Sequence, residues 1–542
     1  MPSRYLPFAL IAILALVVSI AALYSPVWWL LAIVLLVLVA LGVQDLQQRR
    51  STVRRNYPLI GRVRFLAEDL RPFVRQYFVE DDDAEVPFSH NQRSVVYHRA
   101  QGTLDKLPFG TERNVYAGGH EWINHSLAPV HSDAEQFRIE VGGSQCRQPY
   151  SASVLNISAM SFGSLSANAI LALSGGAKGG RFYHDTGEGG LSPYHLAGGG
   201  DLVWEIGSGY FGCRNRAGGF DEQAFADKAQ NPQVKMIEVK LSQGAKPGHG
   251  GILPGAKVSE EIASVRGVQI GEDCVSPAAH SAFSTPAELL IFLDRLRQLS
   301  GGKPVGFKLA IGHPWEWFGI VRAMLDGGPL PDFVVVDGAE GGTGAAPLEF
   351  ADHVGLPLRE ALLLVHQTLV GAGLREQIRI GAAGKIISAF DMARTMALGA
   401  DWCNSARGFM FALGCIQSLH CHTDRCPSGV ATQDPDRQRG LDPDLKSERV
   451  RRFHAQTLHA LAEMLGAAGL QHPSELGPEH IFKRLPNGEI KPLASLHPGL
   501  FSGELLQGTP NRSPFREFWP EARADSFGPP AELASLRLSK LH

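Results

Sequence analysis

Short apolar runs alternate with longer segments of helical periodicity through the middle of this chain. The first clear case is an apolar run at residues 154–160, followed by residues 164–177, which have helix composition behind a serine suited to capping the first turn. Short apolar runs bounded by turns are typical of buried strands. The pattern therefore predicts a strand followed by a helix.

This strand-and-helix unit recurs along the chain as far as residue 404. We expect further strands at residues 235–239, 304–309, 333–336, 377–380 and 400–404, and helices at residues 259–266, 286–299, 317–325, 358–370 and 389–398. Parallel neighbours need a crossover between them, so this alternation predicts a parallel sheet. About eight such units predict a closed (β/α)8 barrel of the α/β class, with a doubly wound open sheet as the structural alternative.

Two long uncharged stretches open the chain, at residues 6–23 and 27–43. Each is close to the roughly 20 residues with which a helix spans a bilayer. Arginines flank the pair on both sides: Arg4, Arg49, Arg50, Arg54 and Arg55. Because positive flanks stay on the cytoplasmic side, we expect a two-helix hairpin in the cell membrane and a cytoplasmic body. A cleaved signal peptide at the first stretch is the alternative.

These patterns divide the chain into four regions. We expect a transmembrane hairpin at residues 1–46, a mixed segment at 47–150 that packs on the barrel, and the barrel itself at 151–470, which ends in a long helix at 447–470. The tail at 471–542 is rich in proline and polar residues, and we expect it to wrap the barrel surface.

The charge of the chain is nearly balanced. Lys and Arg total 51 against 54 Asp and Glu, a formal net charge of -3 at pH 7, so no nucleic-acid partner is expected. Seven residues are cysteines, and a cytoplasmic location makes structural disulfides unexpected. The thiols are therefore expected to be free or to bind metal.

Cys415, Cys421 and Cys426 lie in one short loop with the spacing C-x5-C-x4-C. Three soft thiolates so close together, followed by Pro and Gly, indicate a metal centre. Zinc prefers four ligands and would also require His420 or His422. Three thiolates suit a 3Fe-4S cluster, or a 4Fe-4S cluster with an outside fourth ligand. Free cysteines with a structural role are the third alternative.

Glycine-rich turns end the last three expected strands, at residues 338–345, 381–385 and 405–408. Exposed backbone amides at helix starts, with Lys385 and Arg407 beside them, are typical of a phosphate site, and the phosphate of a flavin would suit it. A single turn of this kind is most often structural. Three turns at adjacent strand ends favour phosphate binding.

Three earlier loops also carry candidate chemistry. Residues 158–163 include several small residues, which could let backbone N–H groups approach a flat ring, although a simple turn has the same pattern. Residues 240–251 contain two lysines, a glutamine and four glycines, which suit carboxylates and an electron-rich ring; a solvated surface loop is the alternative. Residues 185–190 place Glu188 on an expected flexible hairpin, as a gate or a proton-handling group.

Five unusual motifs occur in this chain in a characteristic order. They are Met160-Ser-Phe-Gly163, Gly187-Glu-Gly-Gly190, Gln243-Gly-Ala-Lys-Pro-Gly248, Gly341-Gly-Thr-Gly344 and the cysteine loop at residues 414–433. Together they resemble the FMN-binding synthase domain of glutamate synthase, over about residues 151–470. The resemblance implies a (β/α)8 barrel with FMN and a 3Fe-4S cluster. It also implies that 2-oxoglutarate and ammonia condense to 2-iminoglutarate, which reduced flavin converts to L-glutamate.

The resemblance implies roles for particular residues. The expected catalytic residues are Lys240, Gln243 and Lys246, facing the flavin and the carboxylates of 2-oxoglutarate, and Glu188, where ammonia arrives. The expected flavin contacts are Met160, Ser161, Gln243, Lys308, Gly341, Gly342, Thr343, Gly344, Gly384, Lys385 and Arg407. The expected cluster ligands are Cys415, Cys421 and Cys426. A ferredoxin-like protein or a membrane carrier would supply the electrons.

The sequence departs from the family pattern in ways that concern the substrate more than the flavin. Full-length glutamate synthases begin with a glutaminase domain, whereas here Met1 leads directly into the hairpin, so ammonia is expected to be free or to come from a partner. The segment Ser276-Pro-Ala-Ala-His-Ser-Ala-Phe283 replaces the usual histidine pair, and Ala382-Ala-Gly384 lacks the usual aspartate.

Three other functions stay open on the sequence. The same cofactors would serve to reduce a different imine or keto acid, as the altered loop at residues 276–283 allows. A non-catalytic membrane component that binds FMN and passes electrons is the rival from another class. A zinc-binding scaffold is the last alternative.

Overall fold

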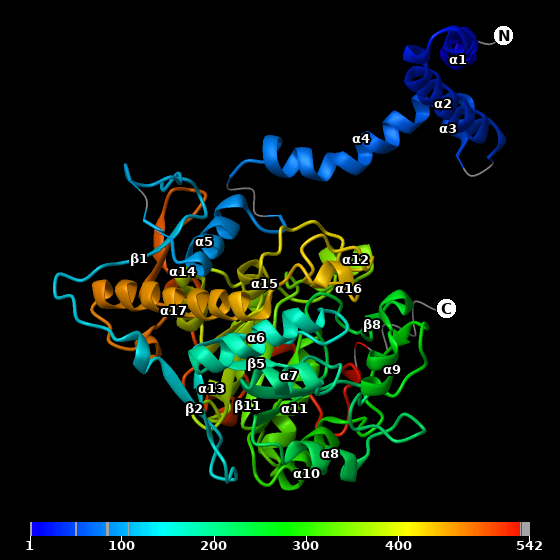
Figure 1. Ribbon diagram of the computed structural model, residues 1–542. Coiled ribbons are helices and arrows are strands. Elements are labelled where there is room, and N and C mark those ends of the chain that lie inside the picture. The colour runs from blue at the N-terminus through cyan, green and yellow to red at the C-terminus, as the bar shows by residue number, and fades with distance from the viewer. Residues whose placement is uncertain are drawn as a thin grey trace. The chain divides into compact units, whose positions relative to one another are not determined.

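The structure, a computed structural model, describes residues 3–48, 51–82, 86–103, 105–106, 108–531 and 533 (Figure 1). It forms two compact units, Met1–Ala84 and Glu85–His542. Arg49 and Arg50, two of the arginines expected to flank the hairpin, lie outside the described residues.

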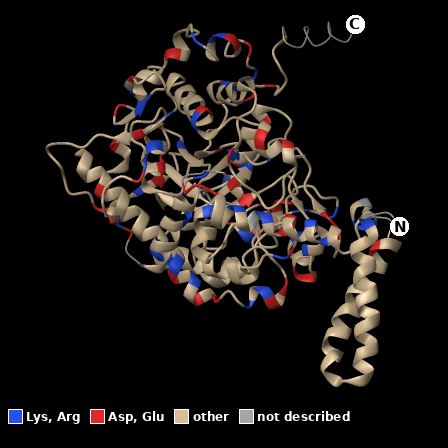
Figure 2. Cartoon of the chain, turned by 90° about the horizontal axis from the view of Figure 1, so that it is seen from above, with Lys and Arg blue, Asp and Glu red and all other residues tan. Residues whose placement is uncertain are grey.

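The first unit begins with two apolar helices, α1 (Leu6–Tyr24) and α2 (Trp29–Gln47), joined by a single 3-10 turn. Ala15, Val18 and Ala22 of α1 are buried against α2. Both helices are long and apolar enough to cross a membrane. Figure 2 shows them free of charged side chains along almost their whole length.

Asp45 ties the end of α2 to the segment that follows. Its carboxylate is fully buried and accepts hydrogen bonds from Arg54 Nε at 2.8 Å, from Arg62 Nε at 2.8 Å and from the Leu59 backbone N–H at 3.2 Å. Arg54 belongs to α3 (Thr52–Asn56) and Arg62 to α4 (Ile60–Val74). The start of α4 is therefore fixed against the end of α2.

The second unit is built around a closed barrel of eight parallel strands, which confirms the expected fold class. In barrel order the strands are β4 (Leu155–Ile157), β5 (Tyr183–Asp185), β6 (Asp201–Ile206), β7 (Val234–Lys240), β10 (Val305–Leu309), β11 (Phe333–Asp337), β12 (Arg379–Ala383) and β13 (Trp402–Ser405). The barrel closes where β13 pairs with β4, with Cys403 opposite Leu155. Closure excludes the doubly wound sheet.

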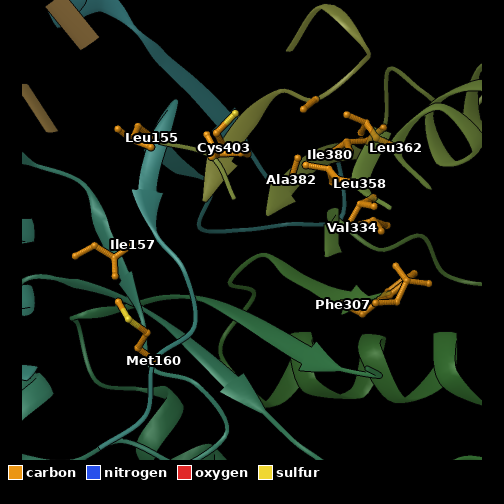
Figure 3. Close-up of a cluster of buried hydrophobic side chains, with 14 of the residues drawn as sticks. Leu155, Ile157, Met160, Phe307, Val334, Leu358, Leu362, Ile380, Ala382 and Cys403 are labelled. Atoms are coloured by element: carbon orange, nitrogen blue, oxygen red, sulfur yellow. The ribbon is translucent and has the colours of Figure 1, made fainter. Parts of the chain in front are cut away.

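Helices surround the barrel and bury its outer face (Figure 1). The crossover helices are α6 (Ala167–Gly180), α7 (Pro193–Gly198), α8 (Glu222–Ala229), α10 (Pro286–Leu299), α11 (Pro314–Leu325), α13 (Leu358–Gly371) and α14 (Ala389–Ala397). The long helix α17 (Pro443–Ala468) follows the last strand. Phe307, Val334 and Ile380 point outward from neighbouring strands into this layer, with Leu358 and Leu362 of α13 beside them (Figure 3). The main core therefore lies between the strands and the helices.

Two features of the barrel differ from the sequence expectation. Strands β5 and β6 were not expected, because β5 has only three residues and β6 carries Asp201 and Glu205 within its apolar run. The expected crossover helix at residues 259–266 is α9 (Glu260–Arg266), which lies in a long excursion between β7 and α10. The same excursion contains the short antiparallel pair β8 (Ile252–Leu253) and β9 (Cys274–Val275).

The segments on either side of the barrel pack onto it and onto each other. β1 (Glu121–Ile123) pairs with β14 (Ile481–Arg484), which pairs with β15 (Ile490–Pro492). The pair β2 (Arg138–Val141) and β3 (Tyr150–Ser153) precedes the barrel. Shorter or outlying helices are α5 (His90–Gln101), α12 (Leu348–His353), α15 (Arg407–Leu413), α16 (Pro435–Gln438), α18 (Leu493–Leu496), α19 (Glu504–Gln507) and α20 (Phe515–Phe518).

Glu121 holds this outer sheet against the barrel helices. Its buried carboxylate lies 2.7 Å from Arg359 of α13, 3.1 Å from Arg394 of α14 and 3.3 Å from Lys483 of β14. Burial would raise the pKa of Glu121, but the three cations hold it below its usual value. The ionised form is therefore favoured in the folded state.

We predict that Glu121→Gln lowers the free energy of unfolding at pH 7 by about 1–3 kcal/mol, since three partly exposed cations lose their anion. A lowered pKa contributes stability above the unfolded value, so the difference from wild type should shrink as the pH falls below 4.5. Denaturant unfolding at several pH values measures this. Glu112→Gln, at an exposed position of the same segment, is the control and should have no effect.

Candidate active site

A cavity of about 1190 Å³, counted with its open mouth, lies at the carboxyl ends of the barrel strands. This is the end of a (β/α)8 barrel where reacting groups gather. The lining contains all the expected catalytic and flavin-contact residues: Met160, Ser161, Glu188, Lys240, Gln243, Lys246, Lys308, Gly341, Gly342, Thr343, Gly344, Gly384, Lys385 and Arg407. Residues that are up to 247 positions apart in sequence thus share one cavity.

Lys240, the last residue of β7, connects two of the expected catalytic side chains. Its ammonium group lies 3.1 Å from Glu188 Oε1 and donates to Gln243 Oε1 at 2.6 Å. Glu188 also accepts a hydrogen bond from Ser276 Oγ at 3.1 Å. Burial would raise the pKa of Glu188, but Lys240 lowers it to about 2, so this carboxylate is ionised at neutral pH.

Glu188 is not on the hairpin that the sequence predicted. It follows β5 in a loop that leads into α7, so the expected hairpin was wrong. Gly187 has φ 64°, and a Cβ there would lie 2.8 Å from the Ser161 backbone N. The Glu188 loop therefore packs directly on the Met160–Ser161 turn that follows β4, and a larger residue at 187 would push them apart.

The loop after β7 reaches across the mouth of the barrel. The backbone N–H of Gly244 donates to Asp337 Oδ2 at 2.8 Å, at the end of β11. A Cβ at Gly244 would lie 1.8 Å from the carbonyl oxygen of Gly338, so only glycine permits this approach. Two residues further on, Lys246 is buried; burial, and then the charge of Lys240, lower its pKa to about 8.

The opposite wall is formed by the turns after β11, β12 and β13, the sixth to eighth strands of the barrel. Arg407 begins the short helix α15 and donates to the carbonyl oxygen of Thr343 at 2.8 Å, which brings two of the turns together. Lys385 stands in a left-handed conformation beside Phe88, 5.7 Å from its ring centroid. Loops after the last two strands and a short helix are the usual phosphate site of this fold.

The cysteine loop lies behind this wall. Cys421 lines the cavity and accepts a hydrogen bond from Arg407 at 3.8 Å, whereas Cys415 and Cys426 are buried deeper. Burial would raise the pKa of Cys426, but Ser428 and the backbone N–H groups of residues 428, 430 and 431 lower it. Burial raises the pKa of Cys415 to about 11; Arg407 opposes this, and Cys421 and Cys426 add to it, so the three sulfurs interact.

The three clustered cysteines do not form a compact group of ligand atoms among the described residues. Across the described part of the chain, the one group of three His, Cys, Asp or Glu whose ligand atoms all lie within 4.8 Å contains no cysteine. Zn–S bonds of about 2.3 Å would place sulfurs on the order of 4 Å apart. Lys257 lies beside this loop and donates hydrogen bonds to Ser164 O and Ala431 O.

A cluster of charged side chains fills the barrel below the cavity. Lys308 of β10 is paired with Glu205 of β6 and lies 3.3 Å from Glu238 of β7. Carboxylate oxygens of Asp185, Glu205 and Glu238 all lie within 4.8 Å of one another. Burial, and then the Glu205 charge, raise the pKa of Asp185 to about 7; burial likewise raises the pKa of Glu238.

The sequence predicted the residues at the mouth of the cavity but not this buried cluster of Lys308 with three carboxylates. Lys308 was expected to contact the flavin; it lines the cavity, and its ammonium group is already held by two carboxylates. The available signal was an acid inside an apolar strand, in Trp-Glu-Ile at residues 204–206 and Ile-Glu-Val at 237–239. A charge in a strand buried on both faces needs a partner inside the barrel.

The segment that departs from the family pattern lies at the edge of the site. His280 bonds to the carbonyl oxygen of Lys240 at 2.8 Å and to Tyr210 Oη at 3.1 Å, and it stacks on Phe283. Burial lowers its pKa to about 4. This histidine therefore supports the Lys240 backbone in neutral form, while Ser276 of the same segment touches Glu188.

A closed parallel barrel with a large cavity at the carboxyl ends of its strands has the layout of a (β/α)8 enzyme. Residues 123–471 match the family model described as the conserved region in glutamate synthase. The chain is 37% identical over 512 residues to the glutamate synthase large subunit-like protein YerD of Bacillus subtilis (strain 168), covering 87% of this chain and 97% of that protein.

An archaeal glutamate synthase (NADPH) of Methanocaldococcus jannaschii is 38% identical over 315 residues, which are 58% of each chain. The glutamate synthase (NADPH) large chain of Bacillus subtilis (strain 168) is 33% identical over 342 residues, 59% of this chain and 21% of that one. The chain thus spans little more than half of the archaeal relative and about a fifth of the large chain. It belongs to the glutamate synthase family and is an oxidoreductase of that type.

The raised pKa of Asp185 predicts a defined pH dependence of stability. The unfolded chain loses the Asp185 proton near pH 4, whereas the folded state keeps it up to about pH 7. The free energy of unfolding of the wild type therefore falls as the pH rises through this range. We expect Asp185→Asn to raise the Tm at pH 8 by about 2–4 °C and to have no such effect at pH 4. Calorimetry measures both values; a lower Tm at pH 8 would contradict the assignment. Asp352→Asn, at an exposed site, is the control.

Proposed function

We propose that this chain makes L-glutamate, reducing 2-iminoglutarate formed from 2-oxoglutarate and ammonia, with electrons passed through an iron-sulfur cluster and FMN. The observation that carries the proposal is that two opposite walls of one cavity present different chemical groups. One wall presents Lys240, Lys246 and an ionised Glu188, and the other presents glycine turns with Arg407. The first suits a dicarboxylate and ammonia, and the second suits a phosphate.

The residues present fit FMN at the second wall. Gly341, Gly342, Thr343, Gly344, Gly384, Lys385 and Arg407 would surround its phosphate, and Met160, Ser161 and Gln243 would lie along its ring. When bound, FMN supplies paired electrons as a hydride to the substrate carbon. The positive charges of Lys240 and Lys246 would favour negative charge nearby, on the substrate or on the reduced ring.

The side chains of the first wall would bind, orient and protonate the substrate. Lys240 would hold a carboxylate of 2-oxoglutarate while its contacts with Glu188 and Gln243 fix its position. Glu188, ionised at neutral pH, would accept hydrogen bonds from the incoming nitrogen rather than donate a proton. Lys246, whose pKa is near 8, is the better proton donor at neutral pH, since a general acid works best near the working pH.

Cys415, Cys421 and Cys426 would hold a 3Fe-4S cluster beside Arg407 and Lys257. A ferredoxin-like protein or a membrane carrier would donate the electrons. The helices α1 and α2 would cross the cell membrane, with Arg4 and the arginines of α3 on the cytoplasmic side together with the barrel unit. Membrane attachment would bring the barrel unit close to a membrane donor.

A second candidate is the same chemistry on a different imine or keto acid. The contact between Ser276 and Glu188 favours it, because the segment that departs from the family pattern reaches a catalytic candidate directly. A panel of keto acids, followed by reoxidation of the reduced protein under anaerobic conditions with ammonium, separates the two candidates. Fastest reoxidation with 2-oxoglutarate supports the first.

The direct test is an anaerobic assay of the full chain with dithionite or reduced ferredoxin, 2-oxoglutarate and ammonium. We expect L-glutamate, and we expect Lys240→Met to lower kcat/KM by roughly 100-fold or more, since a buried charge contact to the substrate is lost. Lys235→Met, on the same strand at the other end of the barrel, should retain activity. No glutamate from protein with full flavin and iron would reject the substrate.

The metal content of the protein tests the proposed iron-sulfur cluster separately. Cys421→Ser should lose iron and the broad visible absorption of iron-sulfur protein, whereas Cys146→Ser, in the segment before the barrel, should keep both. Iron analysis and absorption spectra of anaerobically purified protein measure this. Stoichiometric zinc in the wild-type protein, with no iron, would contradict the cluster.

A further inference from the structure

One face of α4 carries an exposed apolar stripe. Val63, Leu66, Leu70 and Phe73 recur at intervals of three and four residues, so they lie along one side of the helix. Their exposures are 63%, 58%, 49% and 36%. Tyr77, in the π-helical segment Arg75–Val79 that follows α4, is 57% exposed. These five residues are the apolar stripe.

The rest of the helix is strongly basic. Arg64 and Arg71 fall on the face opposite the apolar stripe by the same periodicity, with Glu68 paired to Arg64 at 3.0 Å. Residues 49–75 contain eight arginines against Glu68 and Asp69, which gives this segment a net charge of +6. An acidic run with five Asp and Glu follows at residues 80–85, so the basic charge is local to this segment.

The start of α4 is held at the end of the apolar hairpin. Arg62 in its first turn and the Leu59 backbone N–H both bond to the buried Asp45 of α2. In Figure 1, α1 and α2 are seen nearly end-on, whereas α4 runs across the view. A hairpin that spans a membrane would therefore place α4 at the membrane surface and direct it along that surface.

We propose that α4 lies on the cytoplasmic surface of the membrane, with the apolar stripe in the boundary between headgroups and acyl chains. Arg71, and Arg75 just beyond the helix, pair with the phosphates of anionic lipids. An apolar face with aromatic residues, a basic polar face and low overall hydropathy are the properties of interfacial helices. This inference rests on the proposed membrane hairpin. Pairing with α4 of a second copy is disfavoured, since 15 residues give only about two heptads.

The test uses the full chain in vesicles of phosphatidylcholine and phosphatidylglycerol, with one fluorescent amino acid introduced at Leu66, Glu68 or Leu14. Lipids carrying a nitroxide quencher near the headgroup or deep in the acyl chain report depth. We expect the shallow quencher to act on the probe at position 66 roughly threefold or more strongly than on the probe at 68. The probe at position 14, in α1, should be quenched by the deep nitroxide.

The outcomes distinguish the proposed membrane hairpin from the proposed surface position of α4. If the probe at position 14 is not quenched, the hairpin is not in the membrane, and both the hairpin and the position of α4 are rejected. If it is quenched but positions 66 and 68 respond equally, the hairpin stands and the inference about α4 is overturned, whether the apolar stripe docks on the barrel unit or on a second copy. Leu70→Glu should abolish the response at position 66 and keep that at position 14, whereas Glu68→Gln should change neither.

Discussion

The site depends on the closure of the barrel, where β13 pairs in parallel with β4. Because the strands are parallel and the barrel is closed, the carboxyl ends of all eight strands surround one opening. Without this closure, the Met160 turn after the first strand and Arg407 after the last would lie at opposite edges of an open sheet. With it, these residues, together with Glu188 and Lys240, line the same cavity.

The closed barrel also encloses charges that an apolar core would not contain. Lys308 lies among Glu205, Glu238 and Asp185, three carboxylates around one ammonium group. Burial of excess negative charge opposes folding, so at least part of the cluster holds protons near neutral pH. The cluster forms the floor of the cavity, and it gives the site a polar base that is fixed on strands rather than on loops.

The predictable parts of the fold were those with a strong local signal. The helix expected at residues 286–299 has those bounds as α10, because Thr285 caps it and its apolar residues have one clear period. Lys240, Arg407 and the glycine turns were found since strand ends carried unusual polar residues. Strands β5 and β6 were missed because their acids and short length break the apolar pattern. The closed barrel explains Asp185 and Glu205, which lie with Lys308 inside it.

We propose that this chain holds one flavin and one iron-sulfur cluster at the mouth of a single barrel. Native mass spectrometry of the full chain, purified anaerobically in detergent, measures both at once. The expected mass is that of the polypeptide with one FMN and one 3Fe-4S cluster. The mass of the bare polypeptide, or of the polypeptide with a single zinc ion, would contradict it.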